Sequence, residues 1–183
     1  MDFFKSVKQA IQILKLDENA ISEVASNPNS TIYALVITII AGFASGVVYF
    51  ELLGVKGVIE YIVFLVVSLG VIAGISHILA KLAGGKGEYM HLFRVLGLLY
   101  ITNWTIIIPL IGQILTLVLS VWKIVVGVIT VKSIYKLSTI RAILVVMVPV
   151  ITFVLIIVGY VLLQFLIILY CLSQPSCVEY LHM

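Results

Sequence analysis

Five long runs of apolar residues, with almost no charge inside them, constrain the fold of this chain more than any other feature. The runs cover residues 32–53, 58–83, 89–108, 111–131 and 142–170. Each is about as long as the roughly 20 apolar residues that an α-helix needs to cross a bilayer. The strands of a membrane barrel would alternate apolar with polar residues, and these runs do not. The sequence therefore predicts an all-α polytopic membrane protein, a bundle of five transmembrane helices.

The composition excludes the soluble classes of protein. The 183 residues are 63% hydrophobic and 10% charged, whereas soluble domains are about 45–50% apolar and about 25% charged. A soluble chain of this size would lack the polar groups to cover its exterior, which excludes a cytoplasmic enzyme, a nucleic-acid-binding domain and a disordered chain. We expect an N-terminal cytoplasmic segment over 1–31, a membrane domain over 32–170 and an extracytoplasmic tail over 171–183.

Two of the runs depart from an ordinary span. The third carries His91 and Arg94 near its beginning, so a tilted, partly interfacial helix is an alternative there. The last run would be about 43 Å long at 1.5 Å per residue, which exceeds a hydrocarbon core of about 30 Å. Tilt, or a kink at Pro149, would absorb the excess length.

The positive charges predict the orientation. If the N-terminus is cytoplasmic, nine of the eleven lysines and arginines lie in cytoplasmic segments, Lys56 lies outside, and Lys123 lies within a span. Cytoplasmic loops carry such an excess, which predicts that the N-terminus is inside and the C-terminus outside. The nine form a candidate face for anionic lipids or a protein partner. They are Lys5, Lys8, Lys15, Lys81, Lys86, Arg94, Lys132, Lys136 and Arg141.

The first residues predict an amphipathic helix. Apolar side chains recur there at steps of three and four, at Phe3, Phe4, Val7, Ile11 and Leu14. Such a helix can lie on a membrane surface with its lysines toward anionic headgroups. The alternative is that it packs on the cytoplasmic ends of the spans. The lysines interrupt any apolar core and no small-residue cleavage site follows, so we do not expect a signal peptide.

Small residues within the first two spans predict close helix packing. Gly42 and Gly46 form a GxxxG motif in the first span, and Gly70 and Gly74 form another in the second. Counted from the cytoplasmic ends, the two motifs lie at the same depth. Small residues allow helices to approach closely in lipid. We therefore expect a tight hairpin of these two spans, with a homodimer seam as the alternative.

Lys123 is the one cation near the centre of a predicted span, where it costs at least about 2.5 kcal/mol on insertion scales. It forms a candidate intramembrane polar site together with His77 and Asn103. One reading is a substrate or ion site. The other is that Lys123 snorkels toward the cytoplasm or donates to Asn103 and to backbone carbonyls within the bundle. His77 is more typical of a hydrogen-bonded packing residue than of a proton relay.

The tail and the loops contain few residues that could form a disulfide, a metal site or a catalytic site. Cys171 and Cys177 would lie outside the cell, where a disulfide can form, and two unpaired thiols are the alternative. His182 has no second ligand at metal spacing. Motifs of hydrolases, zinc proteases and phosphate-binding loops are absent from the sequence. We expect no enzyme activity, no metal and no cofactor.

The order of features resembles the Yip domain family, membrane proteins named for interaction with Rab-type GTPases. The matching stretches are Ala83-Gly84-Gly85-Lys86-Gly87-Glu88-Tyr89, Phe93-Arg94-Val95-Leu96-Gly97, Ile108-Pro109-Leu110-Ile111-Gly112, Leu119-Ser120-Val121-Trp122 and Leu137-Ser138-Thr139-Ile140-Arg141-Ala142. The resemblance implies five spans and a role in membrane trafficking, with a small GTPase as a partner by resemblance alone. The short N-terminal segment is typical of a prokaryotic member in the cell membrane; a eukaryotic one would lie in an endomembrane.

Two functions of different classes follow. The first is a non-enzymatic membrane organiser or adaptor, linked to membrane trafficking or membrane-protein assembly, that contacts membrane lipids and a second copy or another membrane protein. The second is a small transporter or channel centred on Lys123. A dry, hydrogen-bonded lysine would favour the first, and a water-filled cavity around it would favour the second.

Overall fold

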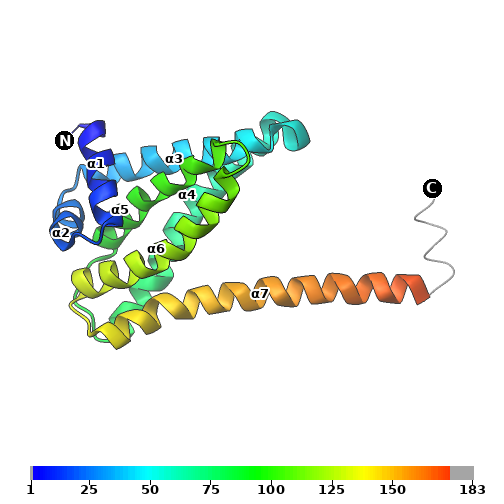
Figure 1. Cartoon of the computed structure of the whole chain (residues 1–183). Helices are drawn as coiled ribbons and strands as arrows, with labels where there is room; N and C mark the ends of the chain where they lie inside the picture. The colour runs from blue at the N-terminus through cyan, green and yellow to red at the C-terminus, as the bar shows by residue number, and fades with distance from the viewer. Residues whose placement is uncertain (1, 174–183) are drawn as a thin grey trace. The chain divides into compact units, whose positions relative to one another are not determined.

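The computed structural model describes residues 2–173, which are helical and contain no strand. In chain order (Figure 1) the elements are α1 (Phe3–Leu14), α2 (Glu18–Ser26), α3 (Ser30–Val48), α4 (Phe50–Leu82), α5 (Tyr89–Leu99), the 3₁₀ helix η1 (Tyr100–Ile107), α6 (Gly112–Tyr135) and α7 (Thr139–Ser173). The predicted all-α fold is confirmed. The chain divides into two units, Met1–Met147 and Val148–Met183.

Several of these helices are suited to a membrane. Within the described residues, four segments are long and apolar enough to cross it: Ser30–Val48, Gly54–Leu82, Tyr89–Ile107 and Gly112–Tyr135. A shorter apolar stretch, Thr139–Thr152, begins α7, which continues as helix through Pro149. The chain is therefore a multi-pass membrane protein.

The connection between the first two spans differs from the expected loop over residues 54–57. α3 ends at Val48, five residues before the expected end of the span, and the chain turns at Tyr49. The break inside α4 falls at Gly54 alone, whose φ of 60° lies in the left-handed region that favours glycine. Lys56, expected in the loop, is already helical because the chain resumes the helix directly after that one residue.

The third span is packed in the centre of the first unit. Leu92, Val95 and Leu98 of α5 are completely buried. The span then tightens into η1, where the Thr102 hydroxyl donates to the Leu99 carbonyl at 2.9 Å and the Thr105 hydroxyl donates to the Thr102 carbonyl at 2.8 Å. α5 is buried because α1, α2, α3, α4 and α6 all pack against it.

The residues before the first span form two helices, and the second was not expected. Asp17 begins α2, since its carboxylate accepts from the backbone N–H groups of Asn19 and Ala20. Ile21 and Val24 of α2 are completely buried in the same cluster as side chains of α1, α3, α5 and α6. The N-terminal segment is therefore part of the packed unit and not a separate tail.

Candidate functional site

The α3–α4 hairpin is packed so closely that two positions of α3 require glycine. A Cβ on Gly42 would lie 2.6 Å from the Cα of Ile62, and a Cβ on Gly46 would lie 2.6 Å from the Cα of Val58. Carbon atoms in ordinary contact are about 3.5–4.0 Å apart. The backbones of the two helices therefore meet here, as small residues allow in a membrane.

The second glycine pair does not meet the first. No described atom lies within 4 Å of a Cβ built on Gly74, and a Cβ on Gly70 would meet the Tyr89 hydroxyl at 3.9 Å. α5 explains the difference, because its Gly97 lies against Ala34 of α3 and Leu69 of α4. The short helix α5 thus lies between the N-terminal half of α3 and the C-terminal half of α4, and the expected pairing of the motifs at equal depth is not formed.

Lys123 of α6 is hydrogen-bonded within the unit. Its ammonium donates to Oδ1 of Asn103 at 2.9 Å and lies 5.6 Å from the centre of the Tyr100 ring. Asn103 and Tyr100 both belong to η1. A carbonyl oxygen and the face of an aromatic ring both attract a cation. The lysine therefore joins α6 to η1, and Asn103 is one of the partners that the sequence indicated.

His77 belongs to a different cluster from Lys123. Its Nδ1 is hydrogen-bonded to the Tyr135 hydroxyl at 2.6 Å, and its ring packs on the edge of Tyr89. Cβ atoms on Gly85 and Gly87 would each come within 2.9 Å of the Tyr135 side chain. The glycine-rich connection before α5 is consequently packed against the end of α6. The structure brings Lys123 and Asn103 together but places His77 elsewhere.

The two tryptophans of the chain hold the two ends of α1. The ring of Phe3 stacks on Trp104 of η1, with the centroids 6.5 Å apart. At the other end, Nε1 of Trp122 on α6 donates to the Leu14 carbonyl at 2.9 Å. This hydrogen bond satisfies one of the carbonyls that the end of a helix leaves free. α1 is thus fixed to the membrane domain at both ends.

The face of α1 that packs inward is not the face that the apolar pattern indicated. Ser6, Gln9, Ala10 and Ile13 are buried. Phe4, expected on the apolar face, is 84% exposed. The exposed stripe is completed by Lys8, Ile11 and Lys15, so it alternates apolar and cationic residues. Periodicity located the helix, but its most buried face includes the polar side chains of Ser6 and Gln9 together with Ala10 and Ile13.

The nine expected cytoplasmic cations lie on neighbouring elements, which we call the cationic end. These elements are α1, the C-terminal ends of α4 and α6, the α4–α5 connection, α5 and the beginning of α7. Lys15 and Lys136 directly follow α1 and α6, and the whole set lies opposite the α3–α4 turn (Figure 1). Some cations also brace this end. Arg94 donates to the Ala25 carbonyl at 2.6 Å, and Arg141 donates to the Ala83 carbonyl at 3.1 Å. Lys5 forms an ion pair of 2.8 Å with Glu23 of α2.

An open polar pocket of about 150 Å³ lies at the cationic end. Its lining residues are Ser22, Ala25, Ser26, His91, Ser133, Ile134 and Lys136. The hydroxyls, imidazole and ammonium are donors that can bind an anionic group. His91 also lies 3.6 Å from a carboxylate oxygen of Glu88. Sequence reasoning missed this pocket, because its residues come from three distant segments and form no motif.

Two expectations concern the end of the chain. The pairing of Cys171 with Cys177, and His182, involve residues 174–183, which lie outside the described residues. Among the residues that the structure describes, no group of three or more histidines, cysteines or carboxylates could hold a metal ion.

The helices define the class of the protein as an all-helical, multi-pass membrane protein. Comparison with protein families is more specific. The family model of the Yip1 domain matches residues 18–161. Because that match covers most of the chain, the protein belongs to the Yip1 domain family, and the resemblance seen in the sequence is confirmed. No curated protein and no solved structure matches the chain.

Proposed function

We propose that this protein is a non-enzymatic membrane adaptor that uses its cationic end to recruit another protein during membrane trafficking or membrane-protein assembly. The observation that carries the proposal is the construction of that end. α1 and α2 are fixed by buried contacts, so the lysines and the polar pocket are held on a rigid surface. Membership of the Yip1 domain family supports a role in the membrane without supplying the partner.

The orientation is part of the proposal. With nine cations at one end and Lys56 at the other, the positive-inside rule favours a cytoplasmic cationic end. That end would then face both anionic lipid headgroups and cytoplasmic partners. A second copy of the chain, another membrane protein and a small GTPase are the kinds of partner considered, the last from family resemblance alone.

The surroundings of Lys123 favour an adaptor over a transporter. Its ammonium has an acceptor in Asn103 and a ring face in Tyr100, and the two open pockets described in the structure are lined by other residues. A buried cation satisfied in this way stabilises helix contacts within the unit, provided that its partners remain. The hydrogen bond to Asn103 supports the scaffold reading of Lys123.

Site-specific photo-cross-linking in native membranes tests the proposal. A photoreactive amino acid at Ser22, on the cationic end, should give a discrete protein adduct, whereas one at Lys56, at the opposite end, should not. The double substitution Lys132→Glu/Lys136→Glu should reduce the Ser22 adduct at least fivefold, and the control Lys56→Glu should leave it unchanged. Equal labelling at both positions, or an adduct insensitive to the double substitution, would refute the adaptor role.

A further inference from the structure

The turn between η1 and α6 has an unusual composition for a loop at the end of a membrane domain. Residues 106–111 read Ile-Ile-Ile-Pro-Leu-Ile, and the sequence holds no charged residue between Arg94 and Lys123. Leu110, at the tip, is 97% exposed. Ile107 and Ile111 are each more than half exposed. Water would surround these side chains if the turn left the bilayer, and such exposure is unfavourable.

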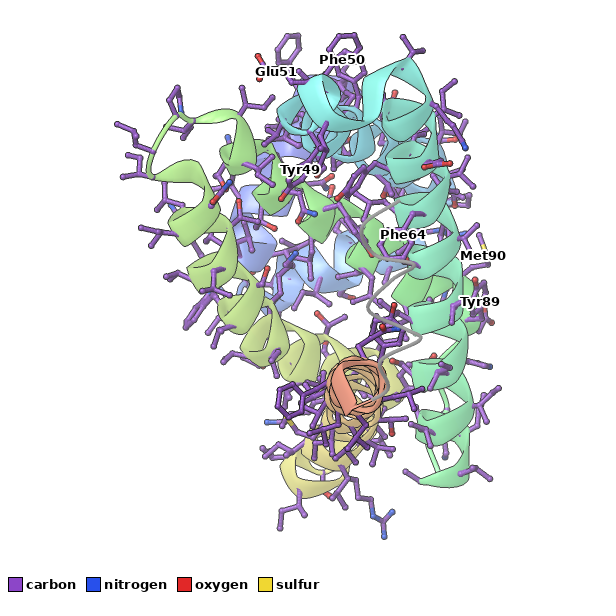
Figure 2. The ribbon with its side chains drawn as sticks, turned by 90° about the vertical axis from the view of Figure 1, so that its right-hand side faces the viewer. Tyr49, Phe50, Glu51, Phe64, Tyr89 and Met90 are labelled. Carbon is purple, nitrogen blue, oxygen red and sulfur yellow. The ribbon has the colours of Figure 1, made fainter. Side chains whose placement is uncertain are left out.

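The other turn at the same end of the unit is built differently. The rings of Tyr49 and Tyr61 stack with centroids 5.5 Å apart, and Lys56 lies 3.7 Å from Glu60 in an exposed ion pair. Tyrosines gather at the membrane–water interface, and charges lie beyond it. Figure 2 shows Tyr49 at this turn with the Phe50 and Glu51 side chains beyond it. The α3–α4 turn thus has the composition of a segment that reaches water.

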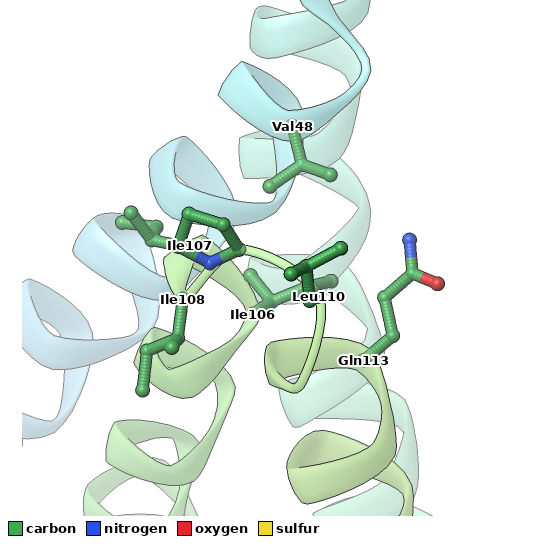
Figure 3. A pocket seen from close by; sticks show the side chains of 7 residues that line it. Val48, Ile106, Ile107, Ile108, Leu110 and Gln113 are labelled. Carbon is green, nitrogen blue, oxygen red and sulfur yellow. The ribbon is translucent and has the colours of Figure 1, made fainter.

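The apolar turn lies beside the C-terminal end of α3. Val48, the last residue of α3, faces the turn across an open pocket of about 440 Å³ (Figure 3). The pocket is lined by Val48, Ile106, Ile107, Ile108, Pro109, Leu110 and Gln113. The apolar turn therefore lies beside the end of α3, next to the position where the aromatic stack begins at Tyr49. In Figure 1 the α3–α4 turn also extends farther from α1 and α2 than the η1–α6 turn does.

The backbone of the turn is suited to an apolar medium. The N–H groups of Ile108, Ile111 and Gly112 donate to carbonyls within the turn at 2.8–3.1 Å, and Pro109 has no N–H to satisfy. Thr105 of η1 and Thr116 of α6 lie on either side of the turn, and their hydroxyls are hydrogen-bonded to each other at 2.9 Å. A backbone inside the hydrocarbon of a bilayer must satisfy its N–H and C=O groups internally, because no water is available there.

We propose that the η1–α6 turn remains inside the apolar part of the bilayer and that its pocket holds an acyl chain of a membrane lipid. The exposed apolar surface continues from Leu110 to Ile114 and Leu117 on α6, so the pocket opens onto the lipid-facing side of that span. Gln113 is the one polar residue of the lining. This proposal is independent of the adaptor function.

Fluorescence of single-cysteine variants tests the depth. In a chain with Cys171 and Cys177 replaced by serine, a bimane label is placed at residue 110 or, as control, at residue 56, and the protein is reconstituted into phosphatidylcholine vesicles. Phosphatidylcholine with brominated acyl chains should quench label 110 at least threefold more than label 56, and aqueous iodide should do the reverse. Iodide is added on both sides of the membrane, so orientation does not affect the comparison. Equal iodide quenching of the two labels would overturn the proposal.

A second variant tests the pocket itself. With the label at residue 113, Val48→Phe should fill the pocket and reduce quenching by brominated lipid at least twofold. Val47→Phe, on the neighbouring exposed position of α3, serves as the matched control and should leave quenching unchanged. Helix content by circular dichroism verifies that each variant is folded. If a folded Val48→Phe protein is quenched like the control, the pocket does not hold an acyl chain.

Discussion

The two glycine motifs allow a controlled test of what sets the spacing between α3 and α4. Gly42 lies against the backbone of Ile62, whereas Gly74 has open space around the position of a Cβ. Alanine at either position adds the same methyl group to a glycine within a span. The pair Gly42→Ala and Gly74→Ala therefore separates the effect of a close contact from the effect of the residue type.

The difference in unfolding free energy between the two variants can be estimated from the distances. A Cβ at 2.6 Å from the Cα of Ile62 reaches ordinary contact only if the helices separate by about 1 Å, and such a gap costs each opened contact about a quarter to a half of its attraction. Overpacking of this kind costs about 1–3 kcal/mol. Replacing a glycine with alanine inside a helix also stabilises the helix by about 1 kcal/mol. This gain is the same at both sites, so it does not contribute to the difference between the two variants. Gly42→Ala should thus be less stable than Gly74→Ala by about 1–3 kcal/mol.

Unfolding in mixed micelles measures this difference. Each purified variant is titrated with sodium dodecyl sulfate in a mild detergent, and far-ultraviolet circular dichroism reports the unfolding midpoint. Gly42→Ala should unfold at a lower dodecyl sulfate fraction than the natural protein, and Gly74→Ala at the same fraction or a higher one. Equal midpoints for the two variants would refute the argument that the close approach at Gly42 holds the hairpin together.

Two further predictions use the same titration. Asn103→Leu should be less stable than Lys123→Met. The first substitution leaves the ammonium of Lys123 without its acceptor, whereas the second removes the cation itself. The opposite order of stability would contradict the hydrogen-bonded role of the lysine. The hydrogen bond from Lys5 holds the pKa of Glu23 below its usual range. This ion pair therefore stabilises the fold above the unfolded carboxyl pKa of about 4.3, and its contribution is lost as the pH falls through the lower pKa of the folded state. The midpoint of the natural protein should fall between pH 7 and pH 3 by more than that of Lys5→Ala, and an equal fall would show that the pair does not contribute.

Sequence reasoning located the spans because their signal is local. A run of about 20 apolar residues identifies a helix in lipid whatever its neighbours are. The ends of the helices were harder to place. The connection between the first two spans was expected around the glycines and lysine at 54–57, but the chain turns at Tyr49 and uses only Gly54 as a break. A glycine in a sequence shows that a left-handed φ is permitted there and not that it is used.

The partners of side chains were predicted less well, because they depend on tertiary packing. The two GxxxG motifs look alike in the sequence, yet Gly46 of α3 lies against Val58 of α4, whereas no described atom lies within 4 Å of a Cβ built on Gly74. The position of α5 between the two spans decides this, and α5 is identified in the sequence only as the most polar of the runs. The hydrogen bond from Lys123 to Asn103 was one of the predicted alternatives, because an ammonium within a span needs an acceptor. α2 was missed even though Asp17 is a helix-capping residue.

The structure links the cationic end to the interior of the membrane domain through two neighbouring residues of α6. Trp122 donates to the end of α1, and Lys123 donates to Asn103 of η1. If a partner displaced α1, the indole N–H of Trp122 would lose its acceptor, the Leu14 carbonyl. The helix that carries Trp122 also carries the lysine that holds η1. A movement of α1 away from α6 therefore breaks the hydrogen bond to Trp122. If α6 moves with α1 to keep that bond, the contact between Lys123 and Asn103 changes as well.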